Sequence, residues 1–210
     1  FNVYGKYEEH KGNSASPYCQ FEIQSKVINN SAVIYLLGSK SSSQRAKLLK
    51  EIVLSNANEL AQEKYLQSEK KIVSFAGTLG HVWVAQTPET KKGNHNGLLD
   101  ESNYTWYRDL GAGLMMQVKS HQFEEVTLAL HDITAENLQA FIVGCEMAAY
   151  NFLSHYKNNS KKIKVNIVSK KFPKSVIESA QLEAAAVQLT RHLLNLPPND
   201  INPATVEALI

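Results

Sequence analysis

The chain has 210 residues, 43% of them hydrophobic and 20% charged, and its formal net charge is +2. This composition is typical of a soluble globular protein of one or two domains, and the small net charge gives no reason to expect a polyanionic partner. Two cysteines are too few for a disulfide framework or a cysteine-rich metal site, and no apolar run approaches the roughly 20 residues that a membrane span requires. We therefore expect a cytoplasmic protein that does not contact a membrane.

Hydrophobic periodicity divides the first half of the chain into a polar leader followed by strands and a helix. Residues 1–20 are polar, and we expect no regular structure there. After them the patterns predict, in chain order, a strand over 31–37, a helix from Ser41 to about Tyr65, strands over 71–76 and 81–86, and a loop over 88–100. The turn Gly77 to Gly80 between the two strands favours a hairpin over a ligand-binding loop.

The second half of the chain has a clearer helical pattern. It predicts a helix over 104–119, a strand over 125–130, a helix from Thr134 to Phe152, a strand over 162–169 and a helix over 176–196. Thr134 is a good N-cap residue, and the helix after it has the cleanest apolar periodicity in the chain. Because strands alternate with helices, we expect a layered α/β domain.

The seven histidines have no spacing that is typical of metal ligands. They are His10, His81, His95, His121, His131, His155 and His192. His131 and Asp132 follow a predicted strand, at the edge where sites of α/β proteins lie. We nevertheless expect structural or solvent-exposed roles for all seven, and no Gly-x-Ser-x-Gly nucleophile motif is present.

Three further features have both a structural and a functional interpretation. The string Gly111-Ala112-Gly113 lies within a helical pattern, which favours close helix packing over a phosphate cradle. Cys145 falls on an apolar helix stripe and should be a buried, inert thiol, whereas Cys19 lies in the polar leader and should be exposed and oxidisable. A lysine cluster favours a solvated strand edge over phosphate or nucleic-acid binding; it consists of Lys161, Lys162, Lys164, Lys170, Lys171 and Lys174.

Two patches in the last third of the chain resemble a known family. Residues 190–199 read TRHLLNLPPN and are followed by Asn202-Pro203. They are similar to the pattern Arg-x-Leu-x-Asn-x-Pro-x-Asn-x-x-x-Pro that joins the two domains of the leucyl aminopeptidase (cytosol aminopeptidase) family. Residues 139–152, QAFIVGCEMAAYNF, resemble the helix that precedes this junction in that family. His192 departs from the acidic residue common at its place in the pattern.

This resemblance implies a three-layer α/β/α domain with a macro-domain-like mixed sheet and a C-terminal linker helix. It divides the chain into a leader (1–20), an N-terminal domain (21–180), a linker with the Pro-Pro break (181–200) and the start of a truncated catalytic domain (201–210). The family's Asn-Thr-Asp-Ala-Glu-Gly-Arg motif and its upstream lysine are absent from this sequence. The resemblance therefore assigns no catalytic, cofactor-binding or metal-binding residue to this chain.

The resemblance also implies what a longer protein would do. It would be a metallo-exopeptidase that removes N-terminal amino acids from peptides, with two divalent ions (Zn, Mn or Mg) in a catalytic domain, and it would assemble as a homohexamer. This chain alone would be inactive, and its partner would be its own C-terminal catalytic domain. Two alternatives remain open at this point: a stand-alone macro-like ligand-binding module and a nucleic-acid-binding domain.

Overall fold

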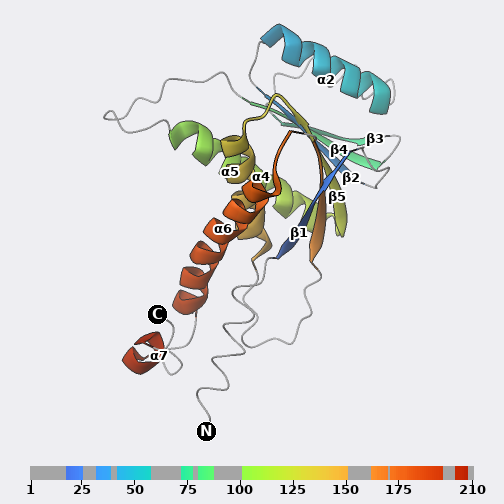
Figure 1. Cartoon of the computed structure of the whole chain (residues 1–210). Helices are drawn as coiled ribbons and strands as arrows, with labels where there is room; N and C mark the ends of the chain where they lie inside the picture. The colour runs from blue at the N-terminus through green and yellow to red at the C-terminus, as the bar shows by residue number, and fades with distance from the viewer. Residues whose placement is uncertain are drawn as a thin grey trace.

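The computed structural model describes residues 18–25, 32–38, 42–57, 72–77, 80–87, 101–150, 162–169, 171–195 and 202–207. Their elements alternate between strands and helices for most of the chain (Figure 1). In order they are β1 (Cys19–Gln24), β2 (Ala32–Leu37), α2 (Ser42–Asn56), β3 (Ile72–Gly77), β4 (Gly80–Gln86), α4 (Glu101–Ser120), β5 (Glu125–His131), α5 (Ala135–Ala149), β6 (Ile163–Val168), α6 (Lys174–Asn195) and α7 (Pro203–Glu207).

The strands form one mixed sheet in the order β1-β6-β5-β2-β4-β3. All neighbouring strands are parallel except β3, which pairs antiparallel with β4 at one edge. Helices α4, α5 and α6 lie on one side of this sheet and α2 lies on the other (Figure 1). The predicted three-layer α/β/α architecture with a mixed sheet is therefore confirmed.

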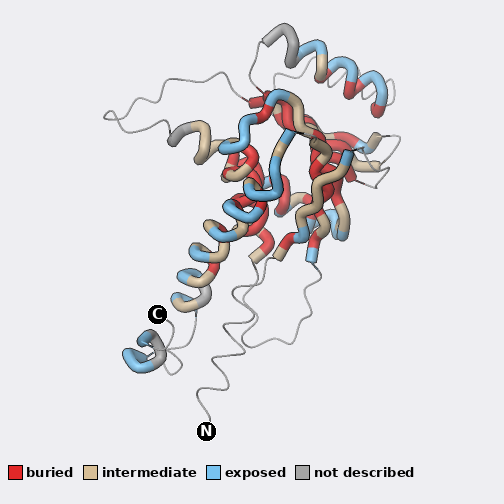
Figure 2. Tube along the Cα trace, in the orientation of Figure 1, coloured by how far each residue is buried: buried red, intermediate tan, exposed pale blue. Residues whose placement is uncertain are grey.

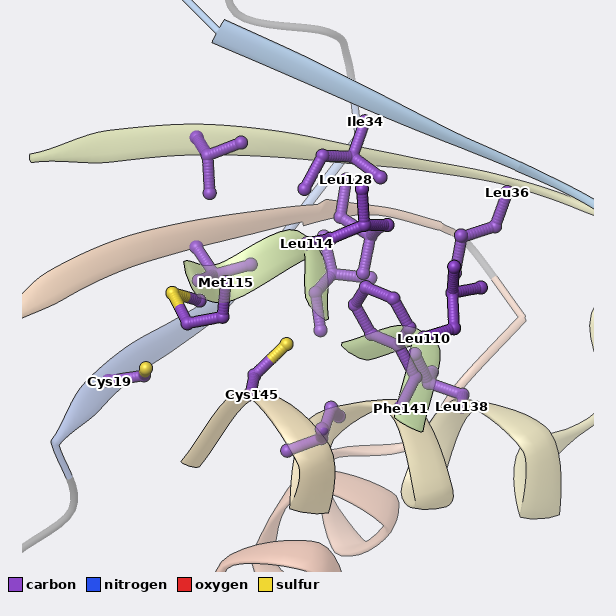
Figure 3. Packing of buried hydrophobic residues seen from close by; sticks show 14 of the residues in the cluster. Cys19, Ile34, Leu36, Leu110, Leu114, Met115, Leu128, Leu138, Phe141 and Cys145 are labelled. Carbon is purple, nitrogen blue, oxygen red and sulfur yellow. The ribbon is translucent and has the colours of Figure 1, made fainter. Parts of the chain in front are cut away.

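The core has two parts because the sheet buries side chains on both faces. The larger part joins the sheet to α4 and α5 through residues such as Leu128, Leu114 and Phe141, each no more than 1% exposed (Figure 3). The smaller part packs Ile52 and Val53 of α2 against β3 and β4. Figure 2 shows this burial as a continuous red centre with an exposed outer side on α2. Alternation of inward and outward residues along each strand makes both parts possible.

Most predicted elements agree with the structure, but two predictions are wrong. Helix α2 ends at Asn56, so the predicted helix does not run unbroken to Tyr65; residues 58–65 lie outside the described residues. At this end the Asn56 side-chain amide donates to the carbonyl of Ile52 at 2.8 Å. Cys19 is not in an exposed leader, because it begins strand β1 and is 0% exposed. The predicted loop over 88–100 lies outside the described residues.

Strand β1 was missed because its sequence, CQFEIQ, is only half apolar. The strand is defined by its parallel pairing with β6, which runs from Cys19 to Gln24 and which the composition of β1 does not indicate. The predicted leader boundary at residue 20 falls inside this strand, and α6 runs unbroken across the predicted boundary at 180–181. No helix in the described ranges is both long enough and apolar enough to span a membrane.

Candidate interdomain junction

Helices α4 and α5 approach each other closely because glycine lies at both sides of their contact. A Cβ atom added at Gly111 would lie 2.2 Å from the carbonyl oxygen of Phe141, and one added at Gly144 would lie 1.9 Å from that of Arg108. Distances below 3.0 Å are incompatible with a side chain at either position. In the string Gly111-Ala112-Gly113, Gly111 therefore serves close helix packing, as predicted from the sequence. Gly113 has open space around its Cβ position and takes no part in this contact.

The C-terminal end of α5 is held by donors from two other helices. The carbonyls of Glu146, Met147 and Ala148 accept hydrogen bonds from Gln188 (3.0 Å), Arg191 (2.9 Å) and Lys119 (3.1 Å), respectively. The Glu146 carbonyl also accepts the backbone N–H of the C-cap residue Tyr150 at 3.1 Å, whereas carbonyls nearer the end of a helix lack partners within it and carry its negative dipole end. Amide and cationic donors from α6 and α4 therefore fix α6 against this end of α5.

Tyr150, the C-cap residue of α5, contacts side chains from α6 and from the start of the described chain. The Arg191 guanidinium lies 4.9 Å from the centre of the Tyr150 ring, and the Asn195 amide donates to its hydroxyl at 3.4 Å. Tyr18 meets the same ring edge-on at 5.6 Å. Arg191 and Asn195 belong to one of the family-like sequence patches, and Tyr150 belongs to the other. The two patches, which are separate in the sequence, are thus in direct contact.

A buried carboxylate anchors strand β1 to the C-terminal end of α5. Glu146 is 1% exposed, and its carboxylate accepts the backbone N–H groups of Tyr18 (2.8 Å) and Cys19 (3.3 Å). Burial raises the pKa of Glu146, and the two N–H donors offset that rise in part. No motif or spacing in the sequence points to this residue. The available signal was a lone glutamate within the apolar run of α5.

Helix α6 is apolar on two opposite faces. Its inner face buries Ile177, Ala180 and Ala184 against the domain. A stripe on its outer face includes Leu182, which is 76% exposed, and the exposed Ala186. A helix that is apolar on both sides is expected to be covered on both sides. The C-terminal half of α6 also extends beyond α5, toward α7 (Figure 1).

Replacement of Arg191 by alanine is expected to destabilise the protein by about 1 kcal/mol. The change removes the hydrogen bond to the Met147 carbonyl and the contact with the Tyr150 ring, while the exposure of both limits the loss. Urea unfolding followed by circular dichroism measures the effect. The matched control is Thr190→Ala, one residue away and exposed, which should change stability by less than about 0.5 kcal/mol. Equal effects of the two changes would show that the contacts of Arg191 with Met147 and Tyr150 do not stabilise the protein.

The histidines do not assemble into a cluster of three ligands. His10, His95 and His155, as well as the side chain of His192, lie outside the described residues. In the described part of the chain, no three His, Cys, Asp or Glu side chains come together in a way that could hold a metal ion. The two metal ions implied by the family resemblance therefore find no matching donor set among these residues.

His131 and Asp132 lie where the sheet changes its winding direction. Neighbouring strands β2 and β5 lead to helices on opposite faces, α2 and α5, which is the position where doubly wound sheets bind ligands. The Gly38 N–H donates to the His131 carbonyl at 2.7 Å and continues the pairing of β2 with β5 at this edge. A Cβ at Gly38 would lie 2.1 Å from the Asp132 carbonyl oxygen. Burial lowers the pKa of His131, whose ring stacks on Tyr35.

The lysine cluster is partly neutralised by its neighbours. Lys164 lies 3.3 Å from Glu22 and 3.6 Å from Glu125, so one strand residue is shared by two carboxylates. Lys162, Lys171 and Lys174 are exposed, whereas Lys161 and Lys170 lie outside the described residues. This arrangement agrees with the predicted solvated edge. Strands β3 and β4 pair antiparallel with Gly77 opposite Gly80, which agrees with the predicted hairpin.

Comparison with known proteins gives matches by structure alone. No protein-family profile and no curated protein sequence matches this chain. A mutant leucine aminopeptidase of tomato superposes with a TM-score of 0.58 at 15% identity, over 91% of this chain and 41% of that enzyme. The leucyl aminopeptidase of Leishmania major gives 0.58 at 12% identity, over 99% of this chain and 41% of that enzyme.

A third aminopeptidase structure also superposes on this chain. The cytosol aminopeptidase of Coxiella burnetii superposes with a TM-score of 0.50 at 12% identity, over 90% of this chain and 36% of the enzyme. At such identities a likeness establishes the fold and not the activity. The chain spans 41% of the length of each of the first two enzymes. It therefore has the fold of a part of the leucine aminopeptidases, the same family that its two sequence patches resemble.

Proposed function

We propose that this chain is the non-catalytic N-terminal part of a leucyl aminopeptidase-like metallo-exopeptidase, and that α6 positions a following catalytic domain. The observation that carries the proposal is the contact between the two family-like patches, through Arg191, Asn195 and Tyr150. A likeness of fold over at least nine tenths of the chain to two leucine aminopeptidases supports it. The outward-facing apolar stripe of α6 supplies a surface for the second domain.

The proposal extends to the complete protein. Its substrates are peptides with a free N-terminus, and it releases single N-terminal residues with two divalent ions, Zn, Mn or Mg, in the catalytic domain. Its location is the cytoplasm and its assembly a homohexamer. In this proposal the chemical steps belong to the catalytic domain; no group of three His, Cys, Asp or Glu side chains that could hold a metal ion occurs among the described residues of this chain. Its contribution is to hold α6, and with it the catalytic domain, in a fixed orientation.

An assay of peptide hydrolysis separates this proposal from an independent enzyme. The 210-residue chain, incubated with leucine p-nitroanilide and Zn²⁺, Mn²⁺ or Mg²⁺, is expected to release no p-nitroaniline above the metal-only blank. The gene product that includes the following catalytic domain should release it in a metal-dependent way. Activity of the shorter chain alone that is abolished by chelator would overturn the assignment as a non-catalytic part.

The docking role of α6 makes a separate prediction. Leu182→Asp should leave the stability of the 210-residue chain within about 0.5 kcal/mol, because the side chain is 76% exposed. In the longer protein the same change buries a charge at the domain contact, so thermal stability and activity should both fall. Met116→Asp on α4, 64% exposed, is the matched control and should change neither. Equal behaviour of the two variants in the longer protein would exclude this face as the docking surface.

A stand-alone ligand-binding module is the second candidate, and one observation favours it. The winding of the sheet reverses between β2 and β5, next to the half-buried His131. A nucleotide such as ATP would then raise the melting temperature of the wild-type chain but not that of a His131→Ala variant. No shift for the wild type up to millimolar nucleotide would remove this candidate.

A further inference from the structure

Two histidines from separate segments meet at the opposite end of the strands from His131. His81 lies at the start of β4, and His121 follows the end of α4. Their ring centres are 4.7 Å apart with the planes inclined by 35°. Trp83 lies 4.1 Å from the His81 ring, and Phe123 lies within 6.3 Å of it. The two imidazoles therefore lie together in a shell of aromatic rings.

The inner histidine has an unused nitrogen. Nε2 of His81 is buried and has no hydrogen-bond partner among the described residues. A buried polar atom without a partner costs free energy, so this nitrogen is a vacant donor or acceptor position. Burial lowers the pKa of His81, and the nearby His121 lowers it further. Both effects favour the neutral imidazole, which is the form that coordinates metal ions.

We propose that His81 and His121 form a two-imidazole site for a borderline transition-metal dication such as Cu²⁺, Zn²⁺ or Ni²⁺. Imidazole nitrogens bind these ions at about 2.0–2.1 Å, and two rings on one tetrahedral ion have their centres roughly 5 Å apart. The observed 4.7 Å fits that requirement. His121 is exposed, so an ion can enter from solvent and water can fill the other coordination positions.

The surroundings hold the inner ligand in place. The Trp83 indole N–H donates to the Gln117 side chain at 2.7 Å, which fixes the ring against which His81 lies. The apolar surroundings of a metal site control the access of solvent to the ion. With two protein ligands and not three, the site is expected to bind reversibly. Spacing along the sequence could not reveal it, because the rest of β4 and all of α4 separate the two histidines in the chain.

Titration with Cu²⁺ tests the proposal on the 210-residue chain, because Trp83 is a built-in reporter. Saturable quenching of tryptophan fluorescence is expected, and His121→Ala should weaken the apparent affinity at least tenfold. His121 is exposed, so this variant should fold. His131→Ala is the control; it lies at the other end of β5 and should bind Cu²⁺ as the wild type does.

A second readout does not depend on fluorescence. Zn²⁺ should raise the melting temperature of the wild-type chain and of His131→Ala, but not that of His121→Ala, because an ion that binds only the folded state stabilises it. Wild-type affinity for Cu²⁺ in His121→Ala, or quenching of the wild type that rises without saturation, would overturn the proposal. This test is independent of any aminopeptidase role, since it measures binding by this chain alone.

Discussion

Gly111→Ala should destabilise the protein by about 3 kcal/mol, whereas Gly113→Ala, two residues further along the same helix, should stabilise it by about 0.5–1 kcal/mol. At Gly111 the new methyl group would meet the backbone carbonyl of Phe141 at 2.2 Å, and a backbone atom of a packed helix cannot move aside as a flexible side chain can. Helices α4 and α5 would have to separate, which opens the larger core. At Gly113 the methyl group meets no atom within 4 Å.

The gain at Gly113 arises mainly from the unfolded state. Alanine has fewer backbone conformations to lose on folding than glycine, and it is the better helix former. Urea unfolding of the wild type and both variants, followed by circular dichroism, gives the change in unfolding free energy that each substitution causes. Two changes of the same sign would contradict the close approach of α4 and α5 at Gly111.

Glu146→Ala is expected to destabilise the protein by about 2–4 kcal/mol. The change removes the carboxylate that accepts the backbone N–H groups of Tyr18 and Cys19, and with it the anchor of an edge strand. Glu51→Ala is the matched control, because Glu51 is an exposed glutamate on α2 and its loss should change stability by less than about 0.5 kcal/mol. Hydrogen exchange should show the loss first in β1.

The carboxyl group of Glu146 also makes the folding stability depend on pH. The sign is opposite to that of a carboxyl whose pKa is lowered in the folded state. Because the folded-state pKa of Glu146 is raised above its unfolded value, the folded protein binds the proton more tightly. The contribution of this group to stability is fully present below the unfolded pKa and is lost as pH rises through the folded pKa. Urea unfolding at several pH values should therefore show a component that Glu146→Gln removes. A variant with the wild-type profile would contradict the raised pKa.

Much of this fold could be predicted from the sequence because many of its signals are local. Thr134 was expected to cap α5, and its hydroxyl does accept the N–H of Asn137 at 3.2 Å. The buried stripe Leu138, Phe141 and Cys145 follows the predicted helical period. The hairpin β3–β4 follows from a glycine-bounded turn between two apolar runs. In each case the signal lies within a few residues of the element that it specifies.

Features that depend on distant contacts were not predictable in this way. Strand β1 is defined by its pairing with β6, which comes from the other end of the chain, and the burial of Cys19 follows from that pairing. The carboxylate of Glu146 has its partners at Tyr18 and Cys19, which no local pattern connects to α5. The resemblance in the last third of the chain predicts an interdomain junction there, and the structure adds that its two patches touch.

The coding sequence beyond codon 210 tests the central claim most directly. The proposed function predicts an open reading frame that continues into a second domain with the motif Asn-Thr-Asp-Ala-Glu-Gly-Arg and its upstream lysine. A stop codon directly after Ile210, or a following domain without that motif, would contradict the assignment of this chain as the non-catalytic part of a metallo-aminopeptidase.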